Sequence, residues 1–170
     1  AKELLHLFRE YAPDICFHLE IHPALLSEEL KEELAILPNG LLHLEAGIQS
    51  LREPVLEKSR RIGKLSDALQ GLKYLCSLKN METHADLIAG LPLYRLSEIF
   101  EDVRTLAEYG AGEIQLESLK LLPGTEMRRR AEELGIQYSP LPPYEVLQTK
   151  EISVEELQTA HYLSRLLDGF

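Results

Sequence analysis

The sequence predicts an α/β fold, a partial (β/α) barrel of four parallel βα units with an extra carboxyl-terminal helix. Four short segments alternate apolar with polar residues, and stretches with helical spacing separate them. Strands that alternate with helices form parallel sheets with right-handed crossovers. Four units cannot close an eight-stranded barrel. A partial barrel or a short open sheet is therefore expected.

The composition of the chain argues against some classes of function. The net charge of −10, without a basic stripe, argues against nucleic-acid binding, and no apolar run approaches the ~20 residues of a membrane span. Cys16 and Cys76 are distant in sequence and form no CxxC, so we expect two buried thiols in a reducing cytoplasm. The chain opens within a helical pattern and without an initiator Met, which suggests a fragment.

The central strand is expected within Leu41–Ser50, LLHLEAGIQS. Strand side chains alternate between the two faces of a sheet. One face then carries Leu42, Leu44, Ala46 and Ile48, and the other carries His43, Glu45, Gly47 and Gln49. Burying Glu or Gln without partners costs on the order of 2–7 kcal/mol or more. The polar row therefore faces water, a ligand or a network of partners.

Three other segments show the same division, Cys16–His22, His84–Leu91 and Glu113–Leu119. We expect aliphatic side chains to face helices on one side of the sheet. A two-layer sheet with a merely solvated second face is the simpler alternative. The polar rows of these segments are His18, Glu20 and His22, then His84 and Asp86, then Glu113, Gln115 and Glu117.

Helices are predicted between the strands. Lys2–Tyr11 has apolar residues at helical spacing, and Ser27 is a candidate N-cap for the helix that follows the first strand. Glu53-Pro54 suits the start of a long helical stretch, because proline is tolerated in the first turn. We expect this stretch to break near Gly63 and to resume at a cap on Ser66.

The second half continues the alternation. Ser97–Tyr109 predicts an amphipathic helix closed by Gly110, and Thr125 caps a charged helix that ends at Leu134-Gly135. Residues 136–152 predict an irregular crossing with a short strand at Val146–Thr149. A capping box at Ser153–Glu156 opens the last helix. The expected division is a partial barrel in residues 1–135, then the crossing and closing helix in residues 136–170.

Ligands of parallel α/β folds bind beyond the carboxyl ends of the strands. Here these ends carry Glu20 to His22, Gln49-Ser50, Asp86 to Gly90 and Ser118 to Lys120. Carboxylates accept hydrogen bonds from hydroxyl or amino groups, and Gln49 can both donate and accept. Arg60 and Arg61 could bind a carboxylate or phosphate, or form a solvated basic patch.

Four stretches in this order resemble the radical S-adenosylmethionine (SAM) enzymes. FHLEIHP is similar to the third barrel strand of that superfamily, LEAGIQS…VLEKSRRIG to the next strand and helix, ADLIAGLP to the fifth strand and LESLKLLPGT to the sixth. The resemblance covers Cys16 to Thr125 and is to the branch of oxygen-independent coproporphyrinogen oxidase and the cobalamin-domain proteins. The tail PPYEVLQTKEIS suits the cobalamin subgroup.

The resemblance implies a carboxyl-terminal part of an enzyme barrel, with SAM across the strand ends and cobalamin in an upstream domain as a further cofactor. Glu20 and Gln49 would contact the amino acid or ribose of SAM, Arg61 its carboxylate, Asp86 the ribose hydroxyls and Ile88 the adenine. Arg60 is adjacent to the matching position. The remaining implied residues are Ser50 at the cofactor, and Glu45, His22 and Glu117 at the substrate or behind the cofactor ligands.

The superfamily's cluster loop, CxxxCxxC, and its GGE strand are absent from these residues. Cysteine thiolates hold 4Fe-4S clusters, so we expect no metal ligand here, cluster ligands in a missing amino-terminal half, and no activity of this chain alone. Two alternatives stay open. One is a divalent-metal-dependent hydrolase using His18, Glu20 and His22 with His43, His84 and Asp86. The other is a non-catalytic interaction module with a docking helix at Arg128–Arg130.

Overall fold

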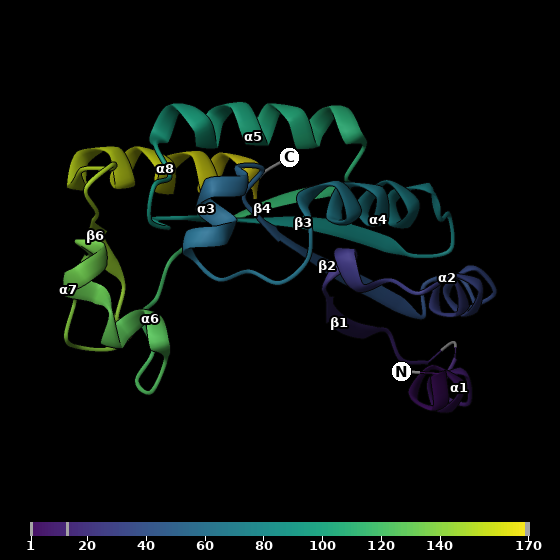
Figure 1. Cartoon of the computed structure of the whole chain (residues 1–170). Coiled ribbons are helices and arrows are strands. Elements are labelled where there is room, and N and C mark those ends of the chain that lie inside the picture. Colours follow the sequence, from purple (N-terminus) through teal and green to yellow (C-terminus); the bar gives the residue numbers. More distant parts are fainter. Residues whose placement is uncertain (1, 13, 169–170) are drawn as a thin grey trace.

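The computed structural model describes residues 2–12 and 14–168. Its main sheet has four parallel strands in the order β1-β2-β3-β4 (Figure 1). The predicted partial barrel of parallel βα units is confirmed, with the third strand beginning two residues earlier than expected. The strands are β1 Phe17–Ile21, β2 Leu42–Gln49, β3 Glu82–Ala89 and β4 Glu113–Ser118.

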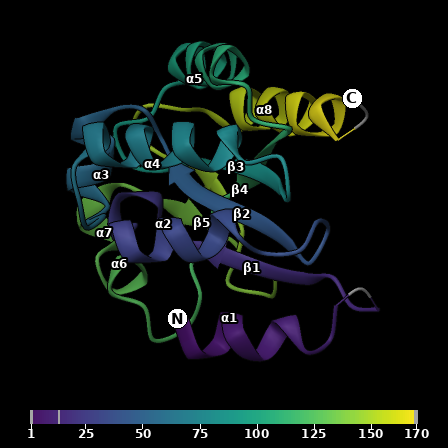
Figure 2. The same ribbon diagram turned by 90° about the vertical axis from the view of Figure 1, so that its right-hand side faces the viewer.

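The helices lie mostly on one side of this sheet. Figures 1 and 2 show α4, α5 and α8 over one face, while no helix of the described residues lies along the strands on the opposite face. None of the helices within residues 2–12 and 14–168 is both long and apolar enough to cross a membrane. The helices are α1 Lys2–Arg9, the 3-10 turn η1 Pro23–Leu25, α2 Glu28–Ala35, α3 Glu53–Lys58, α4 Leu65–Ser77, α5 Leu96–Tyr109, α6 Glu126–Arg129, α7 Ala131–Leu134 and α8 Val154–Leu167.

The two faces of the strands differ as the alternation predicted. Leu44, Ala46 and Leu87 are almost completely buried in the core formed with the helices. In contrast, Glu20 is exposed, and Glu45 and Asp86 are half-buried on the other face. Apolar burial of about 25 cal/mol per Å² makes the helix-covered face the main source of stability. The polar face is left open for a ligand or another segment.

Most predicted caps are confirmed. The Ser27 hydroxyl accepts from the Leu30 amide, Thr125 caps α6, and Ser153 opens α8 with the expected capping box. Gly110 closes α5 in the left-handed conformation. The prediction that Ser66 caps the next helix was wrong. Helix α4 begins at Leu65, and the Ser66 hydroxyl donates to Asp67.

Two further expectations need correction. The charged helix after Thr125 is split into α6 and α7 around Arg130, where the backbone leaves helical geometry. The predicted short strand is present as β6 Val146–Gln148, but it pairs with an unexpected strand, β5 Gln137–Tyr138. Cys16 is exposed beside the edge strand β1 and Cys76 is half-buried, so neither is the fully buried thiol that was expected.

Close packing positions the loop after β1. The 3-10 turn η1 lies against α4, where a Cβ on Gly71 would be 2.1 Å from the carbonyl oxygen of Pro23. Only glycine permits this approach. Gly71 therefore fixes the segment that carries His22 at the carboxyl end of β1.

Candidate functional site

A groove of about 350 Å³ lies on the polar face at the carboxyl half of the sheet. The strand register explains its composition: Glu20 is opposite Glu45, Gly47 is opposite Asp86, and Ile88 is opposite Glu117. The groove thus brings together residues that sequence reasoning assigned to cofactor and substrate. It is lined by Glu20, Glu45, Gly47, Gln49, Asp86, Ile88, Gln115 and Glu117.

Asp86 is the most perturbed acid of the groove. Burial, and after it the negative charges of Glu45, Glu20 and Glu117, together raise the pKa of its carboxyl to about 6. Its Oδ1 is buried and has no hydrogen-bond partner within the described residues. A buried acceptor without a donor is costly. The carboxylate is therefore suited to accept hydrogen bonds from a bound molecule.

Arg61, from the loop after α3, lies beside the groove at Gly47 and is not one of its lining residues. Its Nη2 donates to the carbonyl oxygen of Gly47 at 2.6 Å. A Cβ on Gly47 would lie 3.0 Å from Nη2 and 3.6 Å from Oε1 of Glu20, so the glycine leaves the space that the guanidinium needs. Burial lowers the pKa of Arg61, which the charge of Glu20 partly offsets, and its Nε is buried without a partner among the described residues.

The end of α3 determines which of the two adjacent arginines lies beside the groove. Arg60 is left-handed, with φ +56°, and the Arg61 amide donates to the Leu56 carbonyl at 2.8 Å. This is the hydrogen bond of a Schellman turn. Arg60 then pairs with Glu126. Arg61 instead lies against Gly47, which lines the groove.

His22 lies outside the groove lining and holds the loop that carries Arg61. Its Nδ1 accepts from the Ala24 amide at 3.3 Å, so its Nε2 donates to the Ile62 carbonyl at 2.8 Å. Burial, and then the charge of Arg61, lower the pKa of His22. Both effects favour the neutral imidazole that these two hydrogen bonds require.

Ser50 is not in the groove. It is fully buried, and its hydroxyl donates to Asp102 at 3.4 Å and accepts from the Arg52 amide. The preceding residue, Gln49, lines the groove from a left-handed backbone with φ +69°. The chain therefore turns between Gln49 and Ser50 from the ligand-accessible face into the core.

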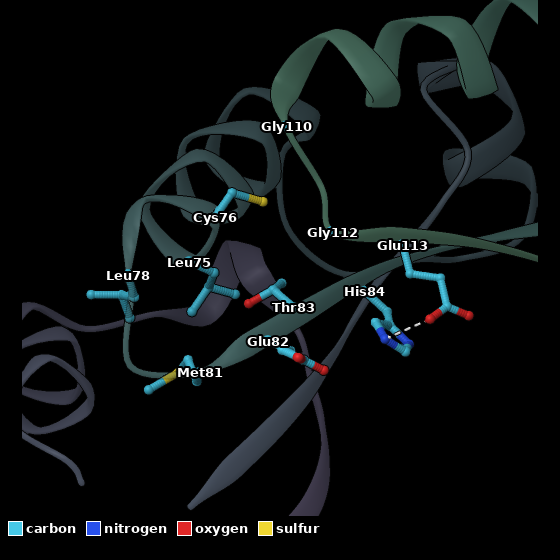
Figure 3. Close-up of a pocket in the computed structure, with 10 residues that line it drawn as sticks. All are labelled: Leu75, Cys76, Leu78, Met81, Glu82, Thr83, His84, Gly110, Gly112 and Glu113. Atoms are coloured by element: carbon cyan, nitrogen blue, oxygen red, sulfur yellow. Dashed lines mark ion pairs between the residues drawn. The ribbon is translucent and has the colours of Figure 1, made fainter. Parts of the chain in front are cut away.

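A histidine cluster occupies the amino-terminal half of the polar face. The rings of His18 and His43 are stacked with centroids 4.3 Å apart, and Nε2 of His43 is 2.5 Å from Nε2 of His84. Nε2 of His84 also lies 3.0 Å from Oε2 of Glu113. Figure 3 marks this pair with a dashed line. Within residues 2–12 and 14–168, no group of three His, Cys, Asp or Glu side chains is arranged to hold a metal ion. The hydrolase alternative gains no support from this arrangement.

A second pocket, of about 330 Å³, lies beside the start of β3. Figure 3 shows the residues that line it. Leu75, Cys76 and Met81 form much of its wall, and Thr83 is buried with a hydroxyl that has no partner among the described residues. This pocket is at the amino-terminal ends of the strands. It is thus separate from the edge of the sheet where ligands of parallel α/β folds bind.

Sequence reasoning missed Gly47 and Gln115 as lining residues. Both stand in the polar rows, which was the signal that could have identified them. Gly47 has no functional group of its own. Its contribution is the space for Arg61, which depends on a loop 14 residues later in the chain.

Solved structures share this fold. The radical SAM methyltransferase TsrM from Kitasatospora setae, solved with cobalamin and a 4Fe-4S cluster, has a TM-score of 0.62 and 19% identity over 92% of this chain and 34% of its own. Coproporphyrinogen III oxidase (HemN) from Escherichia coli, a radical SAM enzyme, has a TM-score of 0.58 and 16% identity over 79% of this chain and 37% of its own. Streptococcus suis SuiB has a TM-score of 0.56 and 14% identity over 78% and 32%.

These similarities show the fold, and the chain spans about a third of the length of the structures it matches. Residues 132–170 match a family described as a protein of unknown function, DUF4080. No curated protein matches the sequence. The sheet and its helices thus share the fold of one part of these radical SAM structures.

Proposed function

We propose that this chain is the carboxyl-terminal part of a radical SAM enzyme and that the groove binds S-adenosylmethionine. The observation that carries the proposal is the pair of Asp86 and Arg61, both with buried polar atoms lacking partners among the described residues. Asp86 lines the groove in the carboxyl half of the sheet and Arg61 lies beside it at Gly47, near the strand ends where this fold class binds its ligands.

The charge of the groove suits this cofactor. SAM carries a sulfonium, an ammonium and a carboxylate, so it is a cation near neutral pH. The groove offers several carboxylates, Glu20, Glu45, Asp86 and Glu117, and Arg61 beside them. Electrostatic complementarity favours a ligand that is a cation overall and has one anionic group. An anionic ligand such as a nucleotide would be repelled.

The arrangement supports individual roles. Asp86 would accept hydrogen bonds from the ribose hydroxyls, and Arg61 would bind the carboxylate through its free donor positions. Glu20 and Gln49 would bind the ammonium group or the ribose, and Ile88 would pack against the adenine. Glu45 and Glu117 lie in the same groove and would face the substrate. His22 would act indirectly, by holding the loop of Arg61.

The described residues do not fit a 4Fe-4S cluster, because they contain only two cysteines and no group of three metal ligands. In the intact enzyme, the cluster would supply the electron that cleaves SAM. We infer that its ligands, and a cobalamin domain like the one implied by the likeness to TsrM, belong to a preceding half of the same cytoplasmic protein. Residues 1–135 would form the barrel part, and residues 136–170 the crossing and closing helix. The present chain would then be inactive alone.

Isothermal titration of the intact protein with SAM tests the proposal. We expect Asp86→Ala and Arg61→Leu each to weaken binding by tenfold or more, which corresponds to about 1.4 kcal/mol. Arg60→Leu is the matched control, because Arg60 points away from the groove to Glu126. Equal affinity in the wild type, Arg61→Leu and Asp86→Ala would place the cofactor elsewhere. A search for CxxxCxxC in the preceding residues tests the parent enzyme separately.

A further inference from the structure

We propose that Asp102, a buried residue of α5, is a positioning residue that sets the direction of the Gln49 side chain in the groove. It would do so by anchoring the three residues that follow Gln49. This inference rests on the proposed function, because it assigns Gln49 to the SAM site. It adds to the SAM site a residue on a helix that does not line the groove.

Gln49 is held in an uncommon backbone conformation. Its φ is +69°, a value that costs free energy for any residue with a Cβ. The register between β2 and β3 also shifts here, because Gly47 is opposite Asp86 while Gln49, two residues on, is opposite Leu87. A bulge of this kind redirects a side chain. Such a conformation persists only where the surrounding structure enforces it.

Asp102 supplies that enforcement. Its Oδ2 accepts from the Leu51 amide at 2.8 Å, from the Tyr94 hydroxyl at 2.6 Å and from the Ser50 hydroxyl at 3.4 Å. Its Oδ1 accepts from Nε of Arg52 at 2.9 Å and also pairs with Nη2. Asp102, Tyr94 and Ser50 are all fully buried.

Asp102 therefore accepts hydrogen bonds from three consecutive residues, Ser50, Leu51 and Arg52. The hydrogen bonds to this carboxylate are strong and directional, because a charged acceptor in a low-dielectric core binds its donors tightly. Moving the chain at Ser50 would leave the carboxylate without its donors. The left-handed turn at Gln49 is thus the conformation that satisfies Asp102.

Arg52 connects the hydrogen bonds of Asp102 to the segment that carries Arg61. It is the N-cap residue of α3, and α3 leads to the Schellman turn that directs Arg61. Asp102 thus lies behind both segments that supply Gln49 and Arg61. Within this arrangement Gln49 is adjacent in sequence to the anchored residues and should respond most strongly.

A double-mutant cycle on the intact protein tests the inference, with SAM affinity measured by isothermal titration. Asp102→Asn keeps the shape of the side chain but removes its charge and one acceptor. We expect it to raise the dissociation constant about tenfold in the wild type and less than twofold in a Gln49→Ala background. Equal fold-changes in both backgrounds would show a general structural role and overturn the proposal.

Tyr94→Phe removes one donor and leaves the carboxylate in place, so it carries the same cycle if Asp102→Asn does not fold. We expect a smaller increase, about threefold, which again disappears with Gln49→Ala. A threefold loss that remains in the Gln49→Ala background would contradict the proposal in the same way.

A readout without SAM separates this inference from the proposed function. Gln49→Gly should raise the midpoint of thermal unfolding, because glycine accepts positive φ without strain. An unchanged or lower midpoint would show that no strain is held at Gln49, and would overturn the positioning claim whatever the cofactor. A wild type that binds no SAM, together with a raised midpoint, would instead refute the proposed function and leave the anchored turn.

Discussion

Asp86→Asn should stabilise the fold at neutral pH while it weakens SAM binding. The Asp86 carboxyl has a pKa of about 6 in place of 3.8, chiefly because it is buried and then because neighbouring carboxylates repel its charge. At 1.36 kcal/mol per pKa unit, ionising this group would cost the folded state about 3 kcal/mol. Asp86 is only half-buried, so solvent screening reduces the expected effect to about 1–2 kcal/mol.

The pH dependence follows from the direction of the shift. The folded state binds the Asp86 proton more tightly than the unfolded chain does. The contribution of Asp86 to stability is therefore fully present below about pH 3.8 and is lost as the pH rises through about 6. Asparagine does not titrate. The stability advantage of the variant should grow between these values and reach its full size above about pH 7.

Urea unfolding of the intact protein at about pH 4 and about pH 8 measures this difference. Asp14→Asn is the matched control, because Asp14 is exposed and should give the same stability as wild type at both values. The same stability difference between variant and wild type at both pH values, or a variant less stable than the wild type at pH 8, would refute the reasoning. It would mean that the Asp86 carboxylate has a stabilising donor in the intact protein.

Three other substitutions probe the site. Gly47→Ala should weaken SAM binding about tenfold with little loss of stability, because the new Cβ would lie 3.0 Å from the Arg61 guanidinium and displace it. Titration with SAM measures the affinity, and an unchanged affinity would show that Arg61 is not displaced. His22→Ala should release the loop of residues 59–64, so trypsin should cut there faster, whereas an unchanged cleavage rate would show that the histidine does not hold it. Gly71→Ala should destabilise the fold by about 1–3 kcal/mol in urea unfolding, because its Cβ would be 2.1 Å from a backbone carbonyl; equal stability would show that η1 can move away.

Local pattern was enough to predict the sheet and its two faces. The alternation in Leu41–Ser50 depends only on the period of a strand, so it predicted which side chains of β2 face the core. Caps such as Ser27 and Thr125 were equally accessible, because a cap bonds to amides two or three residues away.

Contacts between distant segments could not be read in this way. Ser50 looked like a strand-end ligand, yet it is bonded to Asp102, 52 residues later. The space that Gly47 leaves for Arg61 and the pairing of β5 with β6 also depend on tertiary packing. The split of the charged helix at Arg130 overrode a favourable helical pattern, as tertiary context often does.

The most direct test of the central claim is a crystal structure of the intact protein grown with SAM. We predict SAM across the carboxyl ends of β1 to β4, with its ribose within hydrogen-bond distance of Asp86 and its carboxylate beside Arg61. A groove filled by other side chains of the protein, or SAM bound away from Asp86 and Arg61, would contradict the account.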